Sequence, residues 1–251
     1  MGFDCVSRIH FGLRRKLNED AVLNCPDRNI WAVADGMGGH EAGEVASAKI
    51  VEALSNITAY GSLTDSLEHR VETVVALLKG VNLALMDLGN ANGEQRTIGS
   101  TIVGLIVDED RFACFWAGDS RAYLLRGDEI SQLSHDHSLV QELVGAGMLE
   151  ADKAEGHPNA NIVTRAVGAK AQLQVDIVIG SLNCGDLFLL ASDGLTRVVK
   201  DGELLLELSA NPPAPAADRR IELTLERGAP DNVSLVVLQV GTRPGGAYPH
   251  P

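Results

Sequence analysis

Ile30-Trp31-Ala32-Val33-Ala34-Asp35-Gly36 is the stretch that decides the fold, because a short apolar run typical of a buried β-strand ends there at an acid followed by glycine. A single Asp-Gly pair after a strand predicts only a tight turn. In this chain, however, acids recur directly after or directly before strand-like runs. The positions are Glu19-Asp20, Asp35, Asp119, Asp193 and Asp231.

If antiparallel strands bring these ends to one rim, the carboxylates meet there. Clustered carboxylates repel one another and resist joint ionisation unless a cation neutralises them. Their oxygen ligands suit Mg²⁺ or Mn²⁺. Two such ions about 3.5–4 Å apart can activate a bridging water and hold a transferring phosphoryl group. The carbonyl of Gly36 is free of side-chain crowding and can add a ligand beside Asp35.

The order of secondary-structure elements predicts the α+β class. Strand-like runs come first, then two long helical segments, then strands again and a late helix, which is not the strict alternation of a parallel sheet. This order suits a sandwich in which helices cover antiparallel sheets. The expected strands are 21–24, 30–34, 100–107, 112–117, 122–126, 175–180, 186–191 and 234–240, and the expected helices are 44–58, 63–89, 138–146 and 216–227.

The length of 251 residues, with 45% hydrophobic residues, fits a single domain at 1–241. Residues 134–170 are polar and contain three histidines, so they are either an insertion near a working surface or an ordinary surface loop. We expect His135 and His137 in this segment to be solvated. Residues 242–251 are rich in Gly and Pro and are expected to be disordered.

The formal net charge of −13, from 34 acids against 21 bases, disfavours a nucleic-acid partner because an acidic surface repels phosphate backbones. No run of roughly 18 apolar residues is present, so we expect no membrane span. The N-terminus carries no apolar stretch of signal-peptide length, which predicts a cytoplasmic protein with reduced thiols. The cysteines form no Cys-x-x-Cys pair and are Cys5, Cys25, Cys114 and Cys184.

Six short motifs occur in the same order as in a known family, from about residue 8 to about residue 240. Together they make the chain similar to the bacterial metal-dependent protein phosphatases (PPM family, protein phosphatase type 2C-like). The resemblance implies a central antiparallel β-sandwich flanked by helices on both sides (α-β-β-α), with a small flap insertion. The motifs are Arg15-Lys16-Leu17-Asn18-Glu19-Asp20, Asp35-Gly36-Met37-Gly38-Gly39-His40, Gly99-Ser100-Thr101, Gly118-Asp119-Ser120-Arg121, Ser192-Asp193-Gly194-Leu195 and Asp231-Asn232.

The resemblance implies a metal centre with two core Mg²⁺ or Mn²⁺ ions and a weaker third ion. Asp35 resembles the carboxylate that bridges the core ions, and Asp119 resembles the acid that holds the third ion together with Asp193. Asp20 resembles a residue that holds metal-bound water. The complete implied set is Glu19, Asp20, Asp35, Gly36, Asp119, Asp193 and Asp231.

The resemblance also implies three catalytic residues, Arg15, His40 and Asn232. Arg15 resembles the phosphate-binding arginine, whose fork can hold two phosphate oxygens; a solvated surface charge is the alternative. Asn232 would pack beside metal-bound water. Some family members have a His directly after the Asp-Gly pair, where this chain has Met37. His40 could protonate the leaving oxygen instead; the alternatives are that it packs or binds substrate, with a metal-bound water as the acid.

The function implied is hydrolysis of phosphoserine and phosphothreonine monoesters in proteins by a metal-activated water, reversing a cognate Ser/Thr kinase. Some relatives of this kind serve type VI secretion systems. Residues 134–170 correspond to the family's flap, which helps to choose protein substrates. A pseudophosphatase or phosphoprotein-binding regulatory module is the alternative, and loss of a core metal acid would favour it. A two-metal hydrolase of nucleotides or nucleic acid is a further alternative, although the net charge argues against nucleic acid, and a monomer is the default expectation.

Overall fold

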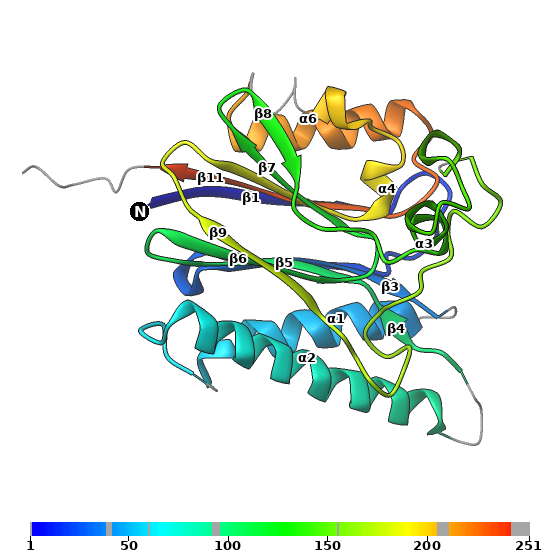
Figure 1. Ribbon diagram of the computed structural model, residues 1–251, viewed down its shortest axis with the longest axis horizontal. Coiled ribbons are helices and arrows are strands. Elements are labelled where there is room, and N and C mark those ends of the chain that lie inside the picture. The colour runs from blue at the N-terminus through cyan, green and yellow to red at the C-terminus, as the bar shows by residue number, and fades with distance from the viewer. Residues whose placement is uncertain are drawn as a thin grey trace, which may run out of the picture.

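Two antiparallel sheets pack face to face at the centre of the molecule, and helices cover their outer faces (Figure 1). The computed structural model describes residues 2–38, 42–59, 61–91, 96–154, 156–204 and 211–241. The tail at 242–251, expected to be disordered, lies outside the described residues, as does His40. Within the described ranges, no helix combines the length and the apolar character that a bilayer span requires.

Every strand pairing in the two sheets is antiparallel. Sheet A contains, in spatial order, β1 (Gly2–His10), β11 (Val233–Gly241), β10 (Leu187–Ala191), β7 (Arg121–Arg126) and β8 (Glu129–Gln132). Sheet B contains β2 (Asp20–Cys25), β3 (Ile30–Met37), β5 (Ile102–Asp108), β6 (Arg111–Ala117) and β9 (Asp176–Ser181), and β4 (Gly99–Ser100) pairs with β3.

The alternation of side chains along the strands creates three apolar layers. Along β3, Trp31 and Val33 point between the sheets, whereas Ala32 points outward to the layer beneath the helices α1 (Ala42–Ser55) and α2 (Leu67–Gly89). On the opposite side, the outer face of sheet A packs against α4 (Asp193–Thr196) and α6 (Pro213–Glu226). The predicted α+β sandwich with helices on both sides is therefore confirmed.

Local capping explains where the helix boundaries differ from the sequence prediction. The second helix starts at Leu67 rather than at 63, because the side chain of Ser66 accepts a hydrogen bond from the His69 N–H at 3.3 Å and caps the helix. The last helix starts at Pro213 rather than at 216, since proline fits the first turn of a helix. The expected strand at 100–107 is divided into β4 and β5 at Thr101.

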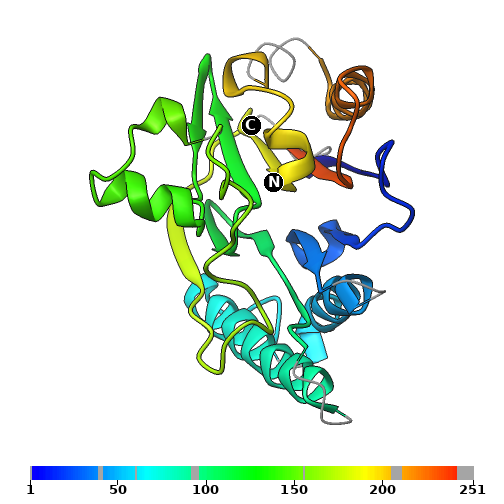
Figure 2. The same ribbon diagram turned by 90° about the vertical axis from the view of Figure 1, so that its right-hand side faces the viewer.

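Residues 134–170, of which all but Glu155 are described, lie at one edge of the sandwich (Figure 2). They contain α3 (Leu139–Gly145), which begins after the N-cap Ser138, and the short helix η4 (Ala151–Lys153). Two isolated bridges tie the segment to itself and to the core, Ser138 to Val163 and Val167 to Ser100. The remaining short helices are η1 (Pro26–Arg28) and η2 (Ile57–Ala59).

Candidate metal centre

The register of β2 and β3 places two acids side by side. Asp20 at the start of β2 lies directly opposite Asp35 near the end of β3. Opposite residues of an antiparallel pair point to the same face, with Cβ atoms about 4.5–5.5 Å apart. The Gly36 N–H donates to the Glu19 carbonyl at 3.1 Å, which extends the contact by one residue. This hairpin therefore brings three of the acidic positions found in the sequence to one edge.

The motif Gly99-Ser100-Thr101 fixes the backbone of Asp35. The Thr101 N–H donates to the Asp35 carbonyl at 2.8 Å, and the Asp35 N–H donates to Thr101 Oγ1 at 3.2 Å. The Ser100 hydroxyl donates to the same carbonyl at 2.9 Å. Because the N–H and the carbonyl of Asp35 are both hydrogen-bonded, the backbone that carries its carboxylate is held in place at the end of β3.

Sheet A contributes Asp193 and Asp231 where β10 ends and β11 begins. The Ser192 N–H donates to the Ser234 carbonyl at 2.9 Å, and the Ser234 N–H donates to Ser192 Oγ at 3.0 Å. Gly194 permits the close approach, since a Cβ there would lie 1.8 Å from the Asn232 carbonyl oxygen. The two acids therefore leave adjacent strands at the same end of the sandwich.

The ends of both sheets enclose one cleft with a volume of about 600 Å³. Asp119, which follows β6, reaches it from sheet B, while Asp20 is buried opposite Asp35. The charged and amide side chains that line the cleft are Arg15, Glu19, Asp35, Asp119, Asn161, Asp193, Arg197, Asp231 and Asn232. The structure thus brings together acids that are separated by more than 200 positions in the sequence, such as Glu19 and Asp231.

The buried acids of the cleft resist ionisation together. Burial raises the pKa of Asp35 well above its ordinary value, and the nearby Asp20 and Asp193 raise it further. Burial likewise raises the pKa of Asp20 to about 7 and that of Asp119 to about 7, with Asp193 adding to both shifts. A neighbouring positive charge lowers the pKa values of such clustered acids and allows them to ionise together.

Unpartnered oxygens indicate that a cation fits here. Glu19 Oε1 and both carboxylate oxygens of Asp20 are buried and accept no hydrogen bond of ordinary geometry from the described residues, and the nearby hydroxyls of Ser192 and Ser234 offset the burial of Asp20 only in part. Buried carboxylate oxygens without a partner are costly, and hard oxygen donors suit Mg²⁺ or Mn²⁺. Within the described ranges, no three acid, histidine or cysteine side chains already stand close enough to share one ion. The metal-binding roles of these acids stay predictions.

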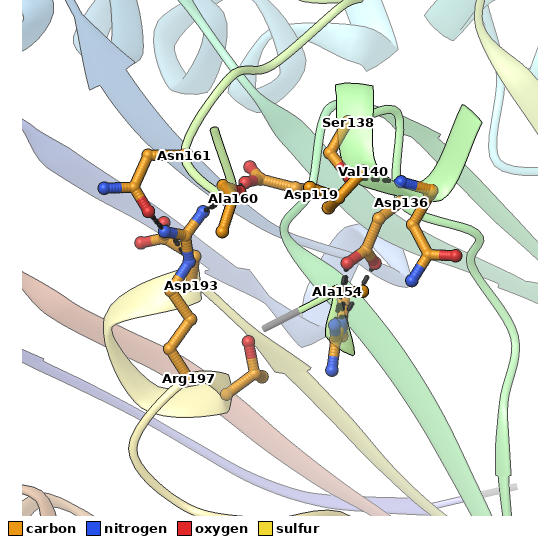
Figure 3. Close-up of a pocket in the computed structure, with 12 residues that line it drawn as sticks. Asp119, Asp136, Ser138, Val140, Ala154, Ala160, Asn161, Asp193 and Arg197 are labelled. Carbon is orange, nitrogen blue, oxygen red and sulfur yellow. Dashed lines mark hydrogen bonds and ion pairs between the residues drawn. The ribbon is translucent and has the colours of Figure 1, made fainter. Parts of the chain in front are cut away.

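Two arginines supply positive charge to the acids of the cleft. Arg15 Nη2 lies 2.7 Å from Asp231 Oδ2, and the Arg15 side chain is half exposed. Arg197 was not singled out from the sequence. Its Nε lies 2.9 Å from Asp193 Oδ2 and its Nη2 lies 3.0 Å from Asp119 Oδ2 (Figure 3). The spacing of four residues between Asp193 and Arg197 indicates an ion pair on one face of a helix.

His137 is also a structural finding, because the expectation that it is solvated is wrong. Its side chain is only 9% exposed, and its Nδ1 accepts a hydrogen bond from the Gly118 N–H at 3.1 Å. Its Nε2 therefore carries the proton, which it donates to Asp176 Oδ2 at 3.1 Å. Burial lowers the pKa of His137, although Asp176 acts in the opposite direction. No local pattern indicates this contact, since Asp176 is 39 positions away.

Comparison with known proteins identifies the family. A family model described as protein phosphatase 2C matches residues 12–227. The chain belongs to the protein phosphatase 2C family. The membership predicted from the six motifs is therefore confirmed.

Two curated members of the protein phosphatase 2C family illustrate the similarity. The serine/threonine protein phosphatase PstP of Mycobacterium tuberculosis is 34% identical over 232 residues, which cover 91% of this chain and 43% of PstP. The chain thus spans less than half the length of PstP. The protein phosphatase PhpP of Streptococcus pneumoniae is 34% identical over 233 residues, which cover 91% of this chain and 94% of PhpP.

Solved structures of the family share the fold over nearly the whole chain. PppA of Pseudomonas aeruginosa, described as a key regulatory component of T6SS, has a TM-score of 0.85 at 40% identity and covers 94% of this chain and 97% of its own. The catalytic domain of PstP in complex with two manganese ions has a TM-score of 0.84 at 32% identity and covers 96% of this chain and 99% of its own.

Proposed function

We propose that this member of the protein phosphatase 2C family is a Ser/Thr protein phosphatase that depends on Mg²⁺ or Mn²⁺. The observation that carries the proposal is the gathering of Asp35, Asp119, Asp193 and Asp231 around one cleft beside Arg15. The unpartnered buried oxygens of Glu19 and Asp20 support a cation at this place. Two manganese ions are bound in the related PstP domain.

In this proposal the core ions are held by Asp35, the Gly36 carbonyl, Asp193, Asp231 and Glu19, with Asp20 behind them. When bound, the ions would supply an activated water and positive charge for the oxygens of a phosphate monoester. Arg15 reaches the cleft from its rim, where its half-exposed guanidinium now pairs with Asp231. A phosphate dianion can compete with Asp231 for that guanidinium, because a planar fork can hold two phosphate oxygens.

In this proposal Asn232 positions other site residues by hydrogen-bonding to the backbone of the segment that carries them. Its Oδ1 accepts a hydrogen bond from the Glu19 N–H at 2.9 Å, and its Nδ2 donates to the carbonyls of Phe11 and Leu17, each at 3.0 Å. These contacts hold the segment that carries both Arg15 and Glu19. Asn232 also lines the cleft, so the predicted contact with metal-bound water is compatible with this positioning role.

The presence of all three core acids, Asp35, Asp193 and Asp231, favours an enzyme over a pseudophosphatase or a phosphoprotein-binding module. We infer that the substrates are phosphorylated proteins and that a cognate Ser/Thr kinase in the cytoplasm produces them. The similarity to PppA makes a type VI secretion system a reasonable setting. The protein would act as a monomer, with residues 134–170 as a flap that helps to select substrates and the remainder of 1–241 as one catalytic domain.

A phosphatase assay with added Mn²⁺ or Mg²⁺ tests the proposed activity. We expect phosphate release from a phosphothreonine peptide but little from a nucleotide, and we expect a chelator to stop it. Asp193→Asn should lower kcat/KM by at least about 100-fold, because the amide keeps the shape but weakens a metal site. Asp27→Asn is the matched control, since Asp27 is exposed in the turn at the opposite end of the β2–β3 hairpin.

Equal activity of Asp193→Asn and wild type would remove Asp193 from the site. Activity that survives the chelator would contradict the proposed metal dependence. Metal binding without turnover of any phosphopeptide would favour the regulatory alternative.

A further inference from the structure

The guanidinium of Arg197 lies between the two acids to which the family resemblance assigns a third ion. Its Nε is 2.9 Å from Asp193 Oδ2, and its Nη2 is 3.0 Å from Asp119 Oδ2. Arg197 directly follows α4, whose first residue is Asp193, and its own N–H donates to the Asp193 carbonyl at 2.9 Å. One helical turn therefore sets the distance between the arginine and the first of its two acids.

In this arrangement the guanidinium already occupies one carboxylate oxygen of each acid. An ion shared by Asp119 and Asp193 would need oxygens from both within about 2.0–2.6 Å. Asp193 Oδ2 and Asp119 Oδ2 instead contact two nitrogens of one guanidinium, whose positive charge repels a further cation. The side chain of Asp119 is 5% exposed, and within the described part of the chain Arg197 is the group that donates to its carboxylate. Loss of Arg197 would leave that buried charge without a partner.

The same guanidinium also contacts the segment 134–170. Its Nη2 donates to the carbonyl of Ala160 at 3.3 Å, and its Nη1 donates to Asn161 Oδ1. The close-up shows Arg197 pointing toward Asp193, Asp119 and Asn161 at once, beside a cavity of about 170 Å³ (Figure 3). A single side chain thus connects two acids of the candidate metal centre with residues of the proposed flap.

We propose that Arg197 replaces the third divalent ion in this chain, neutralising Asp119 and Asp193 and fastening residues 160–161 to them. The inference rests on the proposed two-ion site, and it departs from the three-ion centre that the sequence resemblance implies. A fixed cation of this kind cannot dissociate. The position of the 160–161 segment relative to the acids is then independent of the concentration of a weakly bound ion.

The number of Mn²⁺ ions bound per chain tests the inference without measuring activity. Free Mn²⁺ can be followed by electron paramagnetic resonance while the ion is titrated into the full chain. We expect two bound ions in the wild type. Arg197→Met should bind a third, weaker ion because the acids are released, and Arg197→Met combined with Asp119→Asn should return to two. Arg197→Gln, which keeps a hydrogen-bonding amide without charge, should also bind three.

Arg121→Met is the matched control. Arg121 lines the same cavity but pairs with Asp136, from 2.7 Å, and not with Asp119 or Asp193. We expect this variant to bind two ions, and we expect circular dichroism to show that every variant is folded. As a second measurement, hydrogen exchange should become several-fold faster at residues 160–164 in Arg197→Met but not at β5.

Three bound ions in the wild type would overturn the inference, as would two ions in both Arg197 variants. Either result would leave the proposed two-ion phosphatase intact. A wild type that binds no Mn²⁺ would overturn both this inference and the proposed function, so the two failures are distinguishable.

Discussion

Asn232 shows how a single amide positions a whole segment of the cleft wall. It is 5% exposed, and its side chain satisfies three backbone groups of the segment that leads from β1 to β2. Gly12 allows this segment to come close, because a Cβ there would lie 2.2 Å from the Asp231 carbonyl oxygen. Arg15 and Glu19 therefore depend for their placement on a residue more than 200 positions away.

Asn232→Ala should lower the free energy of unfolding by about 1–3 kcal/mol, because buried backbone groups would lose their partners. Urea denaturation of the metal-free protein measures this change. Asn56→Ala is the control: the Asn56 side-chain amide donates to the Glu52 backbone carbonyl on an exposed surface, so we expect a change within about 0.5 kcal/mol. Unchanged stability of Asn232→Ala together with lost activity would instead assign Asn232 a direct role in the reaction.

At the scale of elements, the start of α1 packs against the end of β3 through two glycines. A Cβ on Gly36 would lie 2.1 Å from the Gly43 carbonyl oxygen and 2.4 Å from the Glu19 carbonyl oxygen. A Cβ on Gly43 would lie 2.4 Å from Glu19 Oε1. The Glu19 carboxylate thus lies at the first turn of a 14-residue helix, where the helix dipole favours negative charge.

Gly36→Ala should destabilise the protein by more than about 2 kcal/mol, since backbone atoms rather than flexible side chains obstruct the new methyl group. It should also raise the Mn²⁺ concentration needed for half-maximal activity. Thermal unfolding compares it with Gly80→Ala in the interior of α2, where a Cβ meets nothing within 4 Å. The Gly80 variant should gain about 0.5–1 kcal/mol, as alanine is the better helix former. Equal melting temperatures for the two variants would contradict this packing argument.

The sequence predicted the buried strands well because β3, β5, β6, β10 and β11 are almost entirely apolar and stop at polar turn residues. It did not predict β1 or β8. Most residues of β1 are half-buried at the edge of sheet A and include Asp4, Ser7 and Arg8, so neither a continuous apolar run nor a strict alternation is present. The strand β8 has four residues, and none of them is buried.

The acids of the cleft were predictable because each one interrupts a strong local pattern. The contacts of His137 and Arg197 were not. The burial of His137 depends on Gly118 and Asp176, which belong to other segments of the chain. Arg197 has a local signal, its spacing to Asp193, but its contact with Asp119 exists only after sheets A and B have packed together.

At the scale of the whole molecule, the segment 134–170 stands beside the cleft and presents an exposed apolar side chain to solvent. Met148, three residues after the end of α3, is 77% exposed. An exposed methionine can contact varied partner surfaces because its side chain is flexible. Because the same segment lines the cleft with Asn161 and Val163, an exposed apolar side chain on it supports the proposal that the segment contacts protein substrates.

Met148→Ala should lower kcat/KM several-fold for a phosphoprotein while leaving the hydrolysis of a small aryl phosphate unchanged. The reason is that a small substrate fills only the cleft. Leu83→Ala is the control, because Leu83 is a comparably exposed residue, 57% accessible, on the outer helix α2. An equal loss on both substrates, or none on either, would count against a role of this segment in selecting substrates.

The turn at the far end of the β2–β3 hairpin sets the register that pairs Asp20 with Asp35. Five residue pairs separate the acids from the turn, in which Pro26–Arg28 form a short helix and Asn29 is left-handed with φ 50°. Adding one residue to that turn would shift the register and direct alternate side chains to the opposite face of the sheet. During evolution this remote turn can therefore accept substitutions that keep its length and its left-handed residue, but a change of its length would separate the acids of the cleft.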